Sequence, residues 1–134
     1  MHSTLTPIQI RFSDVDKLGH VNNAVYLSYI ELARLDFFKA VAGNINWDTE
    51  GIILARVEID YKIPVLLEDK LSVKTWCSRL GTKSFDLSYS IIIKNNGEEI
   101  EKAKAISVLV CFNYSEQKSM LMPEQWRKWL ENKG

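Results

Sequence analysis

Residues 14–24, with the sequence DVDKLGHVNNA, hold the densest group of reactive side chains in this chain. They supply two carboxylates, an imidazole and two carboxamides around Gly19, where the backbone can turn sharply. A long apolar helix is predicted to begin directly after them. Unpaired N–H groups at a helix start can hold developing negative charge, and a neighbouring side chain can act as a base or a nucleophile. This combination predicts a reactive site.

The bulk composition favours one globular domain over residues 1–134. The chain is 46% hydrophobic and 25% charged, which argues against disorder. Seventeen basic and seventeen acidic residues argue against broad nucleic-acid binding. We expect no membrane span, because no run approaches about 20 apolar residues, and the N-terminus lacks a signal-peptide pattern. A cytoplasmic, reduced location is the expectation, with Cys77 and Cys111 as buried apolar residues of strands.

The first elements predicted are a strand and a long helix. Residues 8–13 alternate apolar and polar, which predicts a strand entered after Pro7. The helix is predicted over residues 23–42, closed by Gly43 and Asn44. Apolar residues occupy so much of its circumference that we expect it to be buried nearly all round, by a sheet or by a partner subunit.

Four further strands and a short helix are predicted for the rest of the chain. Hairpin turns are expected at residues 81–83 and at the Asn-Gly pair of residues 95–97. The last strand, residues 99–113, is apolar on both faces, which predicts a central strand or one paired across a dimer. A short helix begins at Pro123. The pattern predicts an α+β fold, in which a curved five-stranded antiparallel sheet wraps a central helix and its open edges favour a homodimer. The four strands are predicted over residues 55–63, 71–80, 85–94 and 99–113.

The reactive stretch and the helix that follows it resemble a known family. The sequence RFSDVDKLGHVNNAVY of residues 11–26, followed by ELAR at 31–34, resembles the signature of hotdog-fold acyl-CoA thioesterases. The 4-hydroxybenzoyl-CoA thioesterase and YbgC-like branch is the most similar, and plant acyl-ACP thioesterases are more distant. The resemblance continues through YKIP at 61–64 and LMPE at 121–124. It implies a hotdog fold, a homodimer or homotetramer with sites at the subunit interface, and hydrolysis of acyl-CoA without a metal or redox cofactor.

The resemblance also assigns roles to residues of the reactive stretch. Asp16 matches the family's catalytic carboxylate, which acts as nucleophile or general base; an Asx-turn residue is the alternative. Asn23, seven positions later, matches the family's main-chain oxyanion donor. Asn22 is a further catalytic candidate, because a histidine and an asparagine of this region take part in the chemistry of the plant acyl-ACP thioesterases. The side chains of Asn22 and Asn23 can instead cap the helix. His20 can orient Asp16, bond the carbonyl, protonate the leaving thiolate or serve only as a structural hydrogen-bonding residue.

Other residues have less specific interpretations. Tyr26 and Glu31 are candidate substrate-binding residues, and pairing with Arg34 is the alternative for Glu31. Asp14 is expected to be structural, capping the turn or pairing with Arg11. The candidates for contacts with the phosphates of coenzyme A are Arg56, Lys62, Arg79 and Lys83.

Two other functions remain open from the sequence. One is a non-enzymatic module that binds acyl-CoA or acyl carrier protein. The other is a hotdog hydratase or dehydratase acting on enoyl or 3-hydroxyacyl thioesters. Acyl chain length and the identity of the thiol carrier are not encoded in residue spacing.

Overall fold

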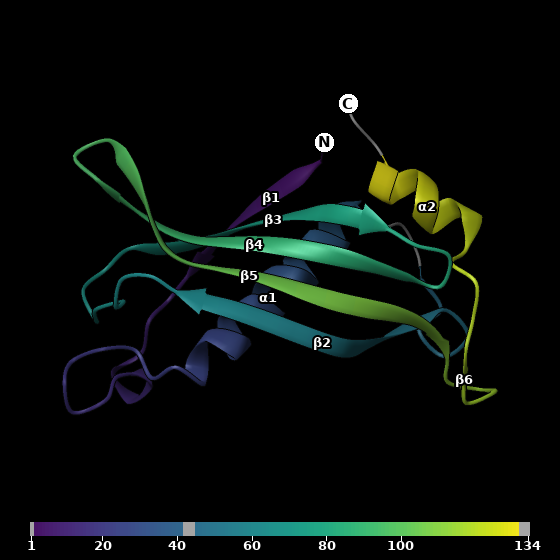
Figure 1. Cartoon of the computed structure of the whole chain (residues 1–134), viewed down its shortest axis with the longest axis horizontal. Helices are drawn as coiled ribbons and strands as arrows, with labels where there is room; N and C mark the ends of the chain where they lie inside the picture. The colour runs from purple at the N-terminus through teal and green to yellow at the C-terminus, as the bar shows by residue number, and fades with distance from the viewer. Residues whose placement is uncertain (1, 42–44, 132–134) are drawn as a thin grey trace.

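The computed structural model describes residues 2–41 and 45–131 and consists of one antiparallel sheet with a long helix across one face (Figure 1). The strand order is β1-β3-β4-β5-β2, and β6 pairs with β5. This is the α+β arrangement predicted above, with β5 between β4 and β2. The elements are β1 (Ser3–Ile8), a 3-10 turn (Phe12–Asp14), α1 (Val25–Val41), β2 (Gly51–Tyr61), β3 (Leu71–Leu80), β4 (Ser84–Asn95), β5 (Glu98–Asn113), β6 (Lys118–Ser119) and α2 (Glu124–Glu131).

Both predicted hairpins are confirmed. Asn96 and Gly97 have φ values of 54° and 82°, so the turn between β4 and β5 needs the left-handed backbone that an Asn-Gly pair adopts readily. Between β3 and β4, the Gly81 N–H donates to the Ser84 carbonyl at 2.7 Å. These local turns set the pairing of the three inner strands.

The prediction for the first strand is wrong. The strand is β1, which pairs antiparallel with β3 from Ser3 opposite Trp76 to Ile8 opposite Leu71. Pro7 therefore lies inside the strand, which is tolerated because β1 is at the sheet edge. The alternation that suggested a later strand belongs partly to the 3-10 turn, where Phe12 is 81% exposed.

Two strand predictions also need correction. β2 begins at Gly51, four residues before the predicted start, because residues 51–54 pair with β5. The short strand β6 was not predicted, so the sheet has six strands rather than five. Two residues are too few to show an alternating pattern in the sequence.

Within the single chain, the helix α1 is buried on one face only. Burial of its other side by a partner subunit stays a prediction. The helix begins at Val25 and ends at Val41, and the predicted Gly43-Asn44 stop lies outside the described residues. Its buried face packs most closely against β1 and β3. Its opposite side carries three leucines that are 45–54% exposed, namely Leu27, Leu32 and Leu35.

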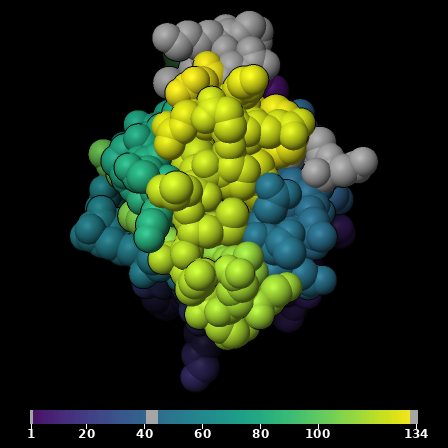
Figure 2. Space-filling view, turned by 90° about the vertical axis from the view of Figure 1, so that its right-hand side faces the viewer, coloured from purple at the N-terminus to yellow at the C-terminus, as the bar shows by residue number. Residues whose placement is uncertain are grey.

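The short helix α2 closes one end of the core. Its Trp126 is 3% exposed and packs edge-on against Trp47 at 6.3 Å and Phe85 at 6.5 Å between ring centroids. Figure 2 shows this yellow segment seated over the end of the molecule, between the β3–β4 hairpin and the segment that leads into β2. Cys77 and Cys111 are both buried free thiols, as predicted.

Candidate active site

The site loop, residues 15–24, folds back on itself between the 3-10 turn and α1. Val15 and Val21 form an antiparallel bridge, and the Asp16 N–H donates to the His20 carbonyl at 2.8 Å. Gly19 has a φ of +79°, a left-handed conformation that side chains disfavour. Its N–H donates to the Asp16 carbonyl at 3.1 Å. Glycine at this position therefore allows the loop to close tightly around Asp16.

The two carboxylate oxygens of Asp16 differ in their surroundings. Oδ1 accepts hydrogen bonds from the Leu18 N–H at 2.9 Å and the His20 N–H at 3.2 Å, so the Asx-turn interpretation is confirmed. Among the hydrogen bonds of the described residues, none involves Oδ2. The side chain is exposed in the single chain. One oxygen thus shapes the loop, while the other is available to a substrate.

Asp14 anchors the start of the site loop from inside the protein. It is 2% exposed, and its carboxylate accepts hydrogen bonds from the Arg11 N–H at 2.9 Å and the Tyr29 hydroxyl at 2.7 Å. The Arg11 guanidinium adds an ion pair at 3.1 Å. Burial opposes ionisation, but these hydrogen bonds and the arginine charge outweigh it and hold the pKa of Asp14 below its ordinary value. The structural interpretation of Asp14, with Arg11 as its partner, is confirmed.

A buried lysine holds residues 64–69, the segment that faces the site loop. Lys102 is 7% exposed, and its Nζ donates to the Pro64 carbonyl at 3.0 Å and pairs with Asp69 at 3.4 Å. The segment then joins the site loop, because the Val21 N–H donates to the Val65 carbonyl at 2.8 Å. A buried ammonium without partners would be costly, so these contacts restrict where the segment can lie.

The site loop, the start of α1 and residues 61–64 line the site pocket, an open cavity of about 400 Å³. Four predicted site residues line it: Asp16, His20, Asn23 and Tyr26. Tyr61, Ile63 and Pro64 were not predicted as site residues, and Lys62 was predicted only as a phosphate contact. The YKIP match was the available signal for them. The full lining is Asp16, His20, Val21, Asn23, Tyr26, Tyr61, Lys62, Ile63 and Pro64.

The two asparagines prepare the start of α1 in different ways. Asn22 Oδ1 accepts from the Ala24 N–H at 2.9 Å, which supports the capping interpretation for its side chain. The Asn22 carbonyl accepts from the Val25 N–H at 2.9 Å. The Asn23 carbonyl accepts from the Tyr61 hydroxyl at 3.0 Å. Within the described part of the chain, the Asn23 N–H donates to no other group, so it is free to bind a substrate oxygen.

Tyr26 forms the inner wall of the site pocket. It is 2% exposed and meets the Tyr61 ring edge-on, with 4.9 Å between centroids and an interplanar angle of 84°. Burial raises the pKa of Tyr26 above its ordinary value of 10.0, so its phenol stays protonated at neutral pH. Its role in substrate binding remains a prediction.

Glu31 lies away from the site pocket. It is exposed and lines a separate cavity of about 430 Å³, together with Arg11 and Tyr29. Among the described residues it forms no ion pair with Arg34, which donates to the Tyr89 hydroxyl at 3.4 Å. Glu31 and Asp16 therefore line different cavities of the single chain, and a substrate-binding role for Glu31 stays a prediction.

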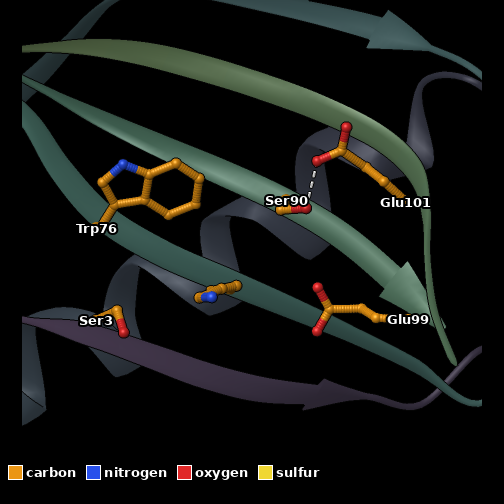
Figure 3. Close-up of a pocket in the computed structure, with 6 residues that line it drawn as sticks. Ser3, Trp76, Ser90, Glu99 and Glu101 are labelled. Atoms are coloured by element: carbon orange, nitrogen blue, oxygen red, sulfur yellow. Dashed lines mark hydrogen bonds between the residues drawn. The ribbon is translucent and has the colours of Figure 1, made fainter. Parts of the chain in front are cut away.

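A third cavity, of about 390 Å³, lies on the sheet face opposite α1 (Figure 3). Trp76, Ser90, Glu99 and Glu101 lie on this face, where Ser90 donates to Glu101. Glu101 also pairs with the side chain of Lys62, a residue that lines the site pocket. None of the predicted site residues lines this outer cavity.

Over residues 2–41 and 45–131, no three His, Cys, Asp or Glu side chains gather in a geometry suited to a metal ion. In the same ranges, neither helix has the length and apolar character needed to cross a bilayer.

Known proteins similar to this chain include several thioesterases. The model of the thioesterase-like superfamily matches residues 10–130. Long-chain acyl-CoA thioesterase FadM of Escherichia coli is 30% identical over 129 residues, which cover 94% of this chain and 96% of that protein. The 1,4-dihydroxy-2-naphthoyl-CoA hydrolase of Nostoc punctiforme is 25% identical over 126 residues, covering 91% and 82% of the two chains.

Thioesterases are also found among the solved structures that are similar to this chain. A thioesterase of Thermus thermophilus, complexed with coenzyme A and zinc, has a TM-score of 0.81 and 35% identity, covering 96% of this chain and 97% of that one. A mutant 4-hydroxybenzoyl-CoA thioesterase, complexed with 4-hydroxybenzoyl-CoA, has a TM-score of 0.86. At 17% identity, with 96% and 99% of the chains covered, it shows the fold alone. The hotdog fold and the resemblance to thioesterases are confirmed, and the protein belongs to the thioesterase-like superfamily.

Proposed function

We propose that this protein hydrolyses the thioester of an acyl-coenzyme A to a free carboxylate and coenzyme A, with Asp16 as the catalytic carboxylate. Thioester hydrolysis is the activity for which its relatives are named. One observation carries the assignment to these residues: Asp16 and Asn23 line the same pocket, at the start of α1. A carboxylate oxygen and a free amide N–H are the two groups that thioester cleavage requires.

Two chemical routes fit the carboxylate. In the first, Asp16 Oδ2 attacks the carbonyl carbon, the C–S bond breaks, and water then hydrolyses the mixed anhydride. In the second, Oδ2 removes a proton from a water that attacks the same carbon directly, and the C–S bond then breaks as the coenzyme A thiolate leaves. Either route places negative charge on the carbonyl oxygen, where the Asn23 N–H would donate. A donor of this kind is typically worth about 3 kcal/mol of barrier lowering.

The remaining predicted residues act around this pair. His20 lines the pocket and is the candidate to orient the carbonyl or to protonate the leaving thiolate. Asn22 sets the geometry of the helix start through its hydrogen bond to Ala24. No metal or redox cofactor is required by either route.

A homodimer or homotetramer belongs to the same proposal. The three exposed leucines of α1 are apolar surface that the single chain leaves uncovered. The edge strands β1 and β2 are available for pairing between subunits. A cytoplasmic location is also part of the proposal, and the free thiols of Cys77 and Cys111 are consistent with a reducing compartment.

The proposal is tested by measuring release of free thiol from a panel of acyl-CoA substrates. We expect Asp16→Asn to lower kcat/KM by about 100-fold or more, the range for loss of a general base. Asp60→Asn is the control, because Asp60 is an exposed strand carboxylate outside the site pocket. An unimpaired Asp16→Asn, or no turnover by the wild type, rejects the assignment.

The same substrate panel distinguishes hydrolysis from binding alone and from hydration, and a labelling experiment addresses the two hydrolytic routes. Tight acyl-CoA binding without thiol release indicates a binding module. Loss of enoyl absorbance without thiol release indicates a hydratase. Acyl carrier protein substrates, assayed in parallel, identify the thiol carrier. In one turnover in labelled water, label that enters Asp16 indicates direct attack by the carboxylate, followed by hydrolysis at the Asp16 carbonyl carbon. Label found only in the product fits both activated water and hydrolysis of the anhydride at the acyl carbon.

A further inference from the structure

Tyr61, the last residue of β2, brings a phenol to the loop that carries the proposed oxyanion donor. Its hydroxyl donates to the Asn23 carbonyl at 3.0 Å, across 38 positions of sequence. Its ring rests edge-on against Tyr26, which is 2% exposed. The direction of the Tyr61 side chain is therefore fixed by a buried neighbour, although Tyr61 itself is 48% exposed.

The peptide unit that carries the Asn23 N–H and the unit that follows it are both held by hydrogen bonds. The Asn23 N–H belongs to the same planar unit as the Asn22 carbonyl, which accepts from the Val25 N–H at 2.9 Å. The next unit begins with the Asn23 carbonyl, which is held by Tyr61. The first anchor is local to the loop. The second anchor comes from the sheet and fixes the loop relative to the wall of the site pocket.

We propose that Tyr61 is a positioning residue for the oxyanion donor, because its hydroxyl holds the Asn23 carbonyl, which lies in the peptide unit next to the one that carries the Asn23 N–H. This inference rests on the proposed function. Preorganised donors stabilise the transition state more than the bound substrate. Loss of the anchor is therefore expected to lower kcat while KM stays nearly constant.

The chain offers a matched control for the test. Tyr114 also donates its hydroxyl to a backbone carbonyl, that of Ile52, at 2.8 Å. Tyr114 is 42% exposed and does not line the site pocket. Tyr61→Phe and Tyr114→Phe thus each remove one half-exposed hydroxyl and one hydrogen bond to the main chain.

The experiment compares kcat and KM of both variants with the wild type on one acyl-CoA. For Tyr61→Phe we expect kcat to fall about 3- to 10-fold, the factor that corresponds to one ordinary hydrogen bond, with KM changed less than about two-fold. For Tyr114→Phe we expect neither constant to change. Thermal melting of both variants shows whether a lower kcat reflects unfolded protein. If Tyr61→Phe melts below the assay temperature, Tyr61→Leu is the second variant, and it must lose at least as much kcat.

The outcomes distinguish this inference from the proposed function. An unchanged kcat in folded Tyr61→Phe overturns the positioning role, and so does a rise in KM alone, which would indicate a simple substrate contact. A fully active Asp16→Asn instead rejects the proposed function, whatever Tyr61→Phe shows.

Discussion

Replacing Tyr29 by phenylalanine removes one hydroxyl from the buried network that anchors the site loop. That hydroxyl donates to the Asp14 carboxylate at 2.7 Å, and the two residues are 3% and 2% exposed. A hydrogen bond to a charged group contributes about 1.5–3 kcal/mol to stability. The Arg11 N–H continues to donate to Asp14 at 2.9 Å, so the carboxylate keeps a partner. We expect Tyr29→Phe to lower the free energy of unfolding by about 1.5–3 kcal/mol, or Tm by about 5–10 °C.

The pH dependence of this loss follows from the pKa of Asp14. Hydrogen bonds hold that pKa below the ordinary value of 3.8 despite burial. The stabilisation is therefore fully present above the ordinary pKa and is lost as the pH falls through the lower pKa of the folded state. The difference in stability between wild type and Tyr29→Phe should be constant between about pH 6 and 8 and should shrink below about pH 4.

The assay is denaturant unfolding of wild type, Tyr29→Phe and Tyr114→Phe at several pH values. One protein concentration is used throughout, because the stability of an oligomer depends on it. Tyr114→Phe removes a hydrogen bond between neutral groups and should cost at most about 1 kcal/mol, independent of pH. Equal losses in the two variants, or a Tyr29→Phe loss that persists unchanged in acid, would refute a charged hydrogen bond as the source.

Two further predictions concern the thiols and the exposed face of α1. Burial raises the pKa of Cys111 to about 11 and also raises that of Cys77, so both thiols should react with a thiol reagent at pH 8 at least about 10-fold more slowly than free cysteine. Reaction at the free rate without denaturant would contradict their burial. Leu35→Lys should convert the proposed oligomer to a folded monomer in sedimentation velocity, because Leu35 is 52% exposed in the single chain and belongs to the apolar face proposed to pair between subunits. Leu121→Lys, at an exposed leucine outside α1, should leave the assembly intact, and an oligomer that survives Leu35→Lys would exclude this face as the interface.

Local chemistry made several elements predictable from sequence. The Asn96-Gly97 turn is encoded by two adjacent residues that tolerate positive φ. The two-sided apolarity of β5 indicated a central strand, and β5 lies between β4 and β2. The boundaries of β1 and β2 were not predictable in this way. They depend on pairing with β3 and β5, which are distant in sequence.

The sequence alone determined the composition of the site loop, the turn at Gly19 and the helix that follows, because each depends on residues within a few positions. Only the tertiary structure decided which other groups join them. It brought Tyr61 to the Asn23 carbonyl, kept Glu31 in a separate cavity and left Leu35 uncovered. These outcomes depend on how the sheet curves and where α1 crosses it. Such geometry arises from contacts between distant residues and is not encoded in the spacing of any one segment.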